Sequence, residues 1–175
     1  MKRAELEHLL RAAAGITGAD RFIVIGSQAI LGQFPDAPAE LLVSMEADLY
    51  SPRDAHEADL IDGSIGEGSP FHRTFGYFAH GVGKETATLP TGWRERLVPL
   101  ASGVTGGATG LCLEVHDLAV SKLVAGRPKD VQFIADLLRH GLVNVDKLRQ
   151  RLRETKLDER LREVYEARLS RITRI

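Results

Sequence analysis

At 175 residues, with 43% hydrophobic and 27% charged residues, the chain has the size and composition of one folded domain, or of one domain with a small helical annex. This composition excludes a disordered or fibrous protein. The apolar runs fall far short of the ~20 residues that cross a bilayer, so no membrane partner is expected. The single cysteine, Cys112, cannot form an internal disulfide, and no signal peptide is evident, which favours a cytoplasmic location.

Charge is balanced overall but uneven along the chain. The formal net charge is −1, which gives no general argument for nucleic-acid binding. Residues 144–175 hold 10 Lys and Arg against 6 Asp and Glu, whereas residues 1–143 hold 13 against 18. The simplest interpretation of this basic end is a solvated helix surface.

The front of the chain alternates helix and strand patterns. Leucines at i, i+3 and i+4 predict a helix over 4–14, and β-branched and aromatic residues predict a buried strand over 21–25. Gly26 and Ser27 follow that strand, with Ser27 as the expected N-cap of a short helix. A helix is expected from Pro52 to about residue 61. Further strands are expected over 45–50, 75–80, 93–100 and 111–115.

Helices dominate the predicted rear of the chain. Asp117 is the expected N-cap of a helix over 118–125, which ends before Pro128 because proline disfavours helical geometry in the preceding residue. Pro128 then starts a helix to about residue 140, and two more helices follow from about 145 and about 159. The expected fold is a mixed α/β core over residues 1–115 with a C-terminal helical bundle over residues 116–175.

The sharpest candidate site combines a Gly-Ser turn after one strand with two carboxylates inside another. Glu46 and Asp48 are two residues apart, and side chains at i and i+2 of a strand project from the same face. Two carboxylates so placed can converge on one divalent cation, or on a pair of cations that drives phosphoryl transfer. Gly26 lets a phosphate approach the backbone, and N–H groups at a helix start attract anions. Together these features indicate a nucleoside triphosphate site, although a Glu-x-Asp pair is also common on exposed strands.

Four segments resemble, in consistent order, the signatures of bacterial minimal nucleotidyltransferases of the polymerase-β superfamily. The segments are Ile25–Ser27, Glu46–Leu49, Leu113–Val115 and Ser121–Asp130. Within the superfamily, the chain is most similar to the AbiEii-like toxin components and their relatives. The last segment is the most specific. The resemblance implies a polymerase-β-like nucleotidyltransferase core, in which a mixed sheet is flanked by helices.

The resemblance also implies a role for each matching residue. Glu46 and Asp48 would be catalytic and would hold Mg²⁺, with Glu114 as a third metal ligand. Here the chain departs from the usual pattern, because the first acid is glutamate and Glu114 is either that ligand or only a strand end. The implied nucleotide-binding residues are Gly26, Ser27 and Arg127. Lys122 and Asp130 would also be catalytic: Lys122 would contact the phosphates or the base, and Asp130 would orient Lys122 or Arg127.

The implied function is Mg²⁺-dependent transfer of a nucleoside monophosphate from an NTP to an acceptor such as RNA, within a toxin–antitoxin or defence system. RNA would contact the basic residues of 144–175. The alternative is a catalytically degenerate module that keeps the fold and binds a nucleotide or an antitoxin protein. Cys112 is expected to be a core thiol, and His72, His80 and His116 lack the spacing of zinc ligands relative to it.

Overall fold

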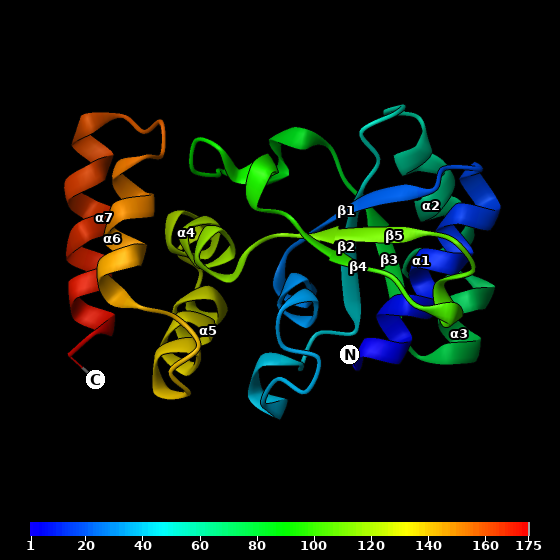
Figure 1. Cartoon of the computed structure of the whole chain (residues 1–175), viewed down its shortest axis with the longest axis horizontal. Coiled ribbons are helices and arrows are strands. Elements are labelled where there is room, and N and C mark those ends of the chain that lie inside the picture. Colours follow the sequence, from blue (N-terminus) through cyan, green and yellow to red (C-terminus); the bar gives the residue numbers. More distant parts are fainter. Residues whose placement is uncertain (175) are drawn as a thin grey trace.

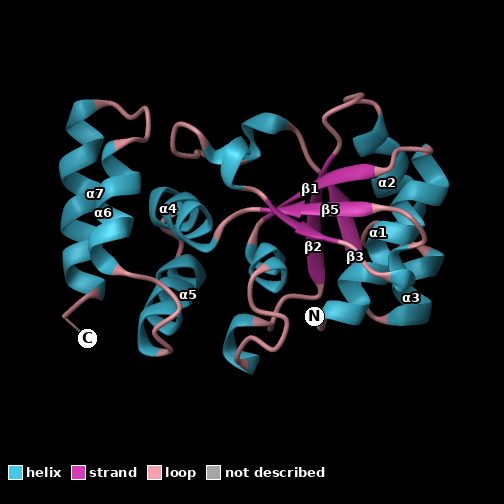
Figure 2. Ribbon diagram, viewed as in Figure 1, coloured by secondary structure: helices cyan, strands magenta, loops and turns pink. Residues whose placement is uncertain are grey.

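A computed structural model describes residues 1–174 and contains a five-stranded mixed sheet flanked by helices, which confirms the mixed α/β class (Figure 2). The strand order is β3-β2-β1-β5-β4. The strands are Arg21–Ile25 (β1), Glu46–Tyr50 (β2), Phe78–Gly81 (β3), Val98–Leu100 (β4) and Thr109–Cys112 (β5). The pairings β1–β5 and β2–β3 are parallel, whereas β1–β2 and β4–β5 are antiparallel.

The α-helices form two groups with the sheet between them, α1–α3 on one side and α4–α7 on the other (Figure 1). The first group comprises Arg3–Thr17 (α1), Glu57–Ile65 (α2) and Pro70–Phe75 (α3). The second comprises Val115–Ala125 (α4), Pro128–Arg139 (α5), Val145–Arg153 (α6) and Glu159–Ile172 (α7). In the part of the chain that the structure describes, no helix combines the length and apolar character needed to cross a membrane.

Alternation along β2 decides which side chains reach the core. Ala47 and Leu49 are fully buried in the hydrophobic core, whereas Glu46 and Asp48 are partly exposed on the opposite face of the strand. The leucines that predicted the first helix are likewise buried on one face of α1. One face of β2 is thus packed against the core, and the face that carries Glu46 and Asp48 stays open.

Several predicted elements in the front of the chain are shifted. Pro52 does not start a helix, because an Asp54 turn intervenes: the Asp54 carboxylate accepts from the N–H of His56, and α2 begins only at Glu57. The strand expected over 75–80 begins only at Phe78. Ser69 caps α3, and this helix extends to Phe75, where the strand was expected to start.

Two further strands differ in their bounds from the prediction. Residues 93–100 divide into a 3₁₀ helix, Trp93–Arg96, and the short strand β4. The strand expected over 111–115 is Thr109–Cys112, after which the chain turns into α4. Asp117 is not the N-cap of that helix. It is buried within the first turn of α4, where it accepts two hydrogen bonds from Arg96.

The predicted helix starts near residues 128, 145 and 159 are confirmed. Side-chain caps explain two of them, because Asn144 accepts from the N–H of Lys147 at the start of α6 and Asp158 accepts from the N–H of Arg160 at the start of α7. Helix α4 packs against α5, α6 and α7 and also contacts the 3₁₀ helix Ser27–Gly32 beside the sheet. It therefore connects the C-terminal helices to the core.

Candidate functional site

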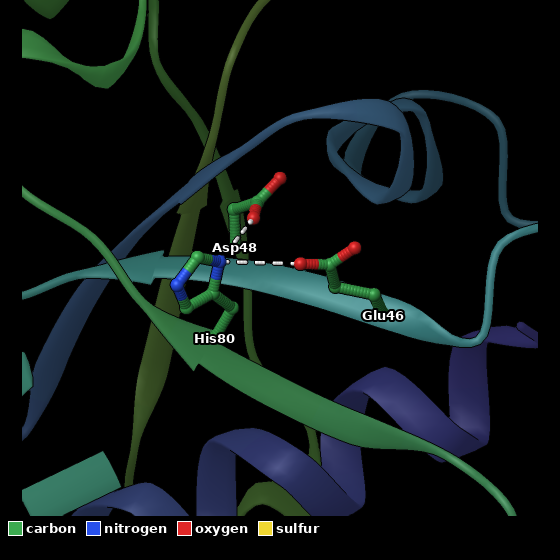
Figure 3. Close-up of side chains that lie close together, drawn as sticks. All are labelled: Glu46, Asp48 and His80. Atoms are coloured by element: carbon green, nitrogen blue, oxygen red, sulfur yellow. Dashed lines mark ion pairs between the residues drawn. The ribbon is translucent and has the colours of Figure 1, made fainter. Parts of the chain in front are cut away.

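Three ligand-type side chains meet on one face of the sheet, two from β2 and one from β3 (Figure 3). Asp48 is the register partner of His80, and Glu46 lies two residues before Asp48 on the same face. The Nδ1 atom of His80 is 3.2 Å from Oε1 of Glu46 and 3.6 Å from Oδ1 of Asp48. One ligand atom from each residue lies within 4.8 Å of the other two. The two carboxylates thus converge as a cation site requires, and His80 joins them.

The sharp turn after β1 gives the Asp48 carboxylate its space. Gly26 has φ of +74°, a conformation that favours glycine, and a Cβ atom at this position would collide with Oδ2 of Asp48. Gly26 rather than Ser27 is the residue before the 3₁₀ helix, and no side-chain cap forms there. The Ser27 hydroxyl group is therefore not used as an N-cap, and Ser27 lines the pocket instead.

Replacing Gly26 with alanine is expected to lower the free energy of unfolding by about 2 to 4 kcal/mol, because it combines backbone strain with a collision at Asp48. The matched control is the same replacement in an Asp48→Ala background, because the backbone strain is kept while the colliding carboxylate is gone. Urea unfolding in both backgrounds separates the two effects. Equal losses in the two backgrounds would show that the approach of Asp48 does not matter.

A pocket of about 640 Å³ lies over the carboxylate pair and falls within the range of about 300 to 1,000 Å³ typical of small-molecule sites. Its walls come from β2 and β3, from the segment before β2, and from α4 and α5. Six of the residues singled out in the sequence line it: Ser27, Glu46, Asp48, Lys122, Arg127 and Asp130.

The turn between α4 and α5 assembles the basic wall of this pocket. Helix α4 ends at Ala125, Gly126 follows as its C-cap with φ of +65°, and Pro128 then begins α5. The turn places Lys122 of α4 and Asp130 of α5 together, with 3.2 Å between Nζ and Oδ1. The Nε of Arg127 donates to Oδ2 of the same carboxylate at 2.6 Å. Asp130 is only 1% exposed, and its carboxylate contacts the positively charged groups of both Lys122 and Arg127.

Electrostatics differ between the two walls. Burial, followed by the Glu46 carboxylate, raises the pKa of Asp48 to about 6, and the charges of His80, Lys122 and Arg127 oppose this shift. On the other wall, burial alone would raise the pKa of Asp130, but its bonds to Arg127 and Lys122 hold that pKa below its usual value. The pocket therefore has an acidic floor, in which two carboxylates repel each other. The facing wall carries the positively charged side chains of Lys122 and Arg127.

Glu114 was expected to be the third metal ligand, but it lies at the start of α4 and does not line the pocket. Its carboxylate caps α4 by accepting from the N–H groups of His116 and Asp117. It also bonds to the His116 ring at 2.7 Å and lies 3.3 Å from Nζ of Lys147 on α6. Burial opposes ionisation, but the His116 and Lys147 contacts hold the pKa of Glu114 at about 2. The bonds of Glu114 therefore stabilise the start of α4 and the contact between α4 and α6.

Replacing Glu114 with alanine is therefore expected to lower the free energy of unfolding by about 2 to 3 kcal/mol through the lost cap and buried ion pairs. Asp158 is a control, because its cap of α7 is exposed and should be worth only about 1 kcal/mol. Any rise in melting temperature that a divalent cation causes in the wild type should persist in the Glu114 variant. Loss of that rise without loss of stability would restore Glu114 as a metal ligand.

A family model described as a nucleotidyltransferase of unknown function (DUF6036) matches residues 4–173, nearly the whole chain. No curated protein and no solved structure matches the chain.

Proposed function

The chain belongs to this nucleotidyltransferase family, and we propose that it transfers a nucleoside monophosphate from an NTP to an acceptor hydroxyl group. The observation that carries the proposal is the convergence of Glu46 and Asp48 on the floor of a pocket whose opposite wall presents Lys122 and Arg127. We further propose a core of the polymerase-β type over residues 1–115, joined to a C-terminal helical region over residues 116–175, in the AbiEii-like branch.

The donor atoms of the floor fit a divalent cation. Carboxylate oxygens are the ligands that Mg²⁺ prefers, and Glu46 and Asp48 each direct one toward the same space. A cation held there would neutralise charge on the triphosphate and favour attack at the α-phosphorus. The raised pKa of Asp48 supports this assignment, because a cation would relieve the repulsion between the two carboxylates.

The remaining pocket residues position the triphosphate. Arg127 presents a guanidinium whose planar donors suit phosphate oxygens, and Lys122 adds a second positive charge. Asp130 fixes the direction of both side chains, and Ser27 adds a hydroxyl group near the carboxylates. During transfer the acceptor oxygen bonds to the α-phosphorus, the bond to the bridging oxygen breaks, and pyrophosphate and the hydroxyl proton leave. Catalysis would rest on positioning and electrostatics.

Incubation with each α-labelled NTP, Mg²⁺ and total RNA tests the proposal. Wild-type protein should label RNA, and Glu46→Gln should lower labelling about 100-fold or more because it removes one of the two negative charges that hold the cation. Asp59→Asn is the control, since it removes a carboxylate from an exposed position on α2 away from the pocket. Equal labelling by wild type and Glu46→Gln would contradict the assignment of the site.

We propose the C-terminal helices as the contact for an RNA acceptor. Some of their arginines are committed to the fold: Arg162 donates to backbone carbonyls at the end of α6, and Arg168 donates to those at the end of α4. Others, including Arg153 and Arg160, are exposed. These exposed cations are the ones available to phosphates.

Replacing Arg153 and Arg160 together with alanine should weaken RNA binding and reduce the slope of log affinity against log salt by about 1.4, because two fewer phosphates are neutralised. Replacing Arg11 and Arg73, exposed on α1 and α3, should leave both quantities unchanged. Filter binding across a salt series measures this. An unchanged slope in the Arg153 and Arg160 variant would leave α6 and α7 as a solvated surface.

One observation favours a second function, a nucleotide-binding or antitoxin-binding module without turnover. Over residues 1–174 the group able to hold a metal comprises Glu46, Asp48 and His80, so its third member is an imidazole, whereas the carboxylate of Glu114 was expected. A crystal structure with Mg²⁺ and a non-hydrolysable NTP distinguishes the two functions. A cation bridging Glu46, Asp48 and the phosphates supports transfer, and a nucleotide bound without such a cation supports the module.

A further inference from the structure

His80 faces the carboxylate pair from a neighbouring strand, yet it is not a core residue. Its side chain is 51% exposed, so packing does not explain its position. The parallel register of β2 and β3 places it beside Asp48, on the same face. Its Nδ1 atom points into the space that the oxygens of Glu46 and Asp48 share (Figure 3).

The other edge of the His80 ring faces a third carboxylate. Nε2 lies 3.9 Å from Oδ2 of Asp62, which is on α2. The second oxygen of Asp62 accepts the N–H of Gly81 at 2.8 Å, so the carboxylate is anchored to β3 itself. A histidine that binds a metal through one nitrogen commonly directs the N–H of the other nitrogen at such a carboxylate, which fixes the tautomer and the ring orientation. Both edges of His80 therefore have the surroundings of a metal ligand.

We propose that His80 is the third protein ligand of the cation site, and that this set of two carboxylates and one imidazole binds a first-row transition-metal ion such as Mn²⁺ in preference to Mg²⁺. The inference rests on the proposed function only for the presence of a cation at this site. Asp62 is a positioning residue, because it acts on the cation through His80.

The preference follows from the chemistry of the donors. Mg²⁺ takes oxygen ligands and gains little from an imidazole, whereas first-row divalent ions accept nitrogen and oxygen donors together. Mn²⁺ is a member of that series that also suits carboxylate oxygens. The opposing possibility is that a protonated His80 forms an ion pair with Glu46 and Asp48 and so competes with any cation for them. The two possibilities predict opposite effects of removing the imidazole.

Titration of the full-length protein with Mn²⁺, without nucleotide, tests the proposal. The electron paramagnetic resonance signal of free Mn²⁺ gives the Mn²⁺ affinity directly, and competition by added Mg²⁺ gives the Mg²⁺ affinity. Wild type should bind Mn²⁺ about 10-fold or more tightly than Mg²⁺. His80→Ala should lose about 10-fold or more in Mn²⁺ affinity and little in Mg²⁺ affinity, and Asp62→Asn should lose Mn²⁺ affinity in the same direction.

Two further variants control for folding and for charge. His56→Ala removes an exposed histidine at the start of α2 and should leave both affinities unchanged. His80→Asp replaces the imidazole with a third carboxylate and should shift the preference toward Mg²⁺. An unchanged ratio of the two affinities in His80→Ala, or tighter binding of both ions, would overturn the proposal.

The outcome is separable from that of the proposed function. Labelling of RNA by a wild type that binds Mg²⁺ and Mn²⁺ equally would overturn the role of His80 and leave nucleotidyl transfer standing. Selective Mn²⁺ binding that depends on His80, without labelling of RNA in either metal, would support the metal site and contradict the transfer.

Discussion

Replacing Asp48 with asparagine is expected to stabilise the metal-free protein by about 2 kcal/mol at pH 7. Burial, together with the Glu46 carboxylate, raises the pKa of Asp48 to about 6, so the folded protein holds this side chain ionised at neutral pH against an unfavourable free energy. Asparagine has nearly the same shape and no charge. A gain in stability on removing a partly buried acid distinguishes a ligand site from a structural carboxylate, whose loss would destabilise the fold.

The sign of the pH dependence is fixed by the same shift. Between about pH 4 and pH 6 the unfolded chain has lost the Asp48 proton while the folded protein still holds it, so this group makes stability fall as pH rises. Above pH 6 its contribution is constant. The advantage of Asp48→Asn over wild type should therefore grow from near zero at pH 4 to its full value at pH 7. Urea unfolding across this range measures it, and a difference independent of pH would contradict the account.

Replacing Asp130 with alanine is expected to lower the free energy of unfolding by about 3 to 5 kcal/mol, because it removes one partner of a buried ion pair. Lys122 is the side chain left without compensation, since it is only 10% exposed, whereas Arg127 is 58% exposed and can turn to water. Nucleotide affinity should fall as well, because both phosphate contacts lose their orientation.

The matched control is Asp136→Ala on the same helix and the same pocket wall. Asp136 is also buried, but its partners Gln132 and Arg139 are exposed, so its loss should be clearly smaller. Adding Lys122→Met to Asp130→Ala should recover part of the stability, because no buried charge then remains unpaired. Strictly additive losses in the double variant would show that the two side chains do not act as a pair.

Local patterns predicted the parts of the site that local structure decides. Glu46 and Asp48 share a face because strand alternation has a period of two, and this holds whatever the neighbouring strands are. The break at Gly126 and Pro128 was equally local, and it brings Lys122 and Asp130 to one wall.

The roles of two residues were not predicted from the sequence, because one depends on which strands pair and the other on which helix end a side chain caps. His80 reaches the carboxylates only because β3 adds to β2 in parallel register, and no local pattern specifies which strands pair. Glu114 lies between a strand and a helix, where a carboxylate suits a metal site or a helix N-cap equally well. The cap prevails because the free N–H groups of α4 lie directly beside it and His116 and Lys147 complete its bonding.

Parallel reactions with α-labelled and γ-labelled NTP test nucleotidyl transfer, because they identify the group that moves. Nucleotidyl transfer at the Glu46–Asp48 floor predicts that the RNA acquires the α-label only, that the γ-label is recovered in pyrophosphate, and that folded Asp48→Asn protein produces neither result. The γ-label in the acceptor would mean phosphoryl transfer instead. That outcome, or no label in the acceptor from any of the four NTPs with Mg²⁺ or Mn²⁺, would contradict the account.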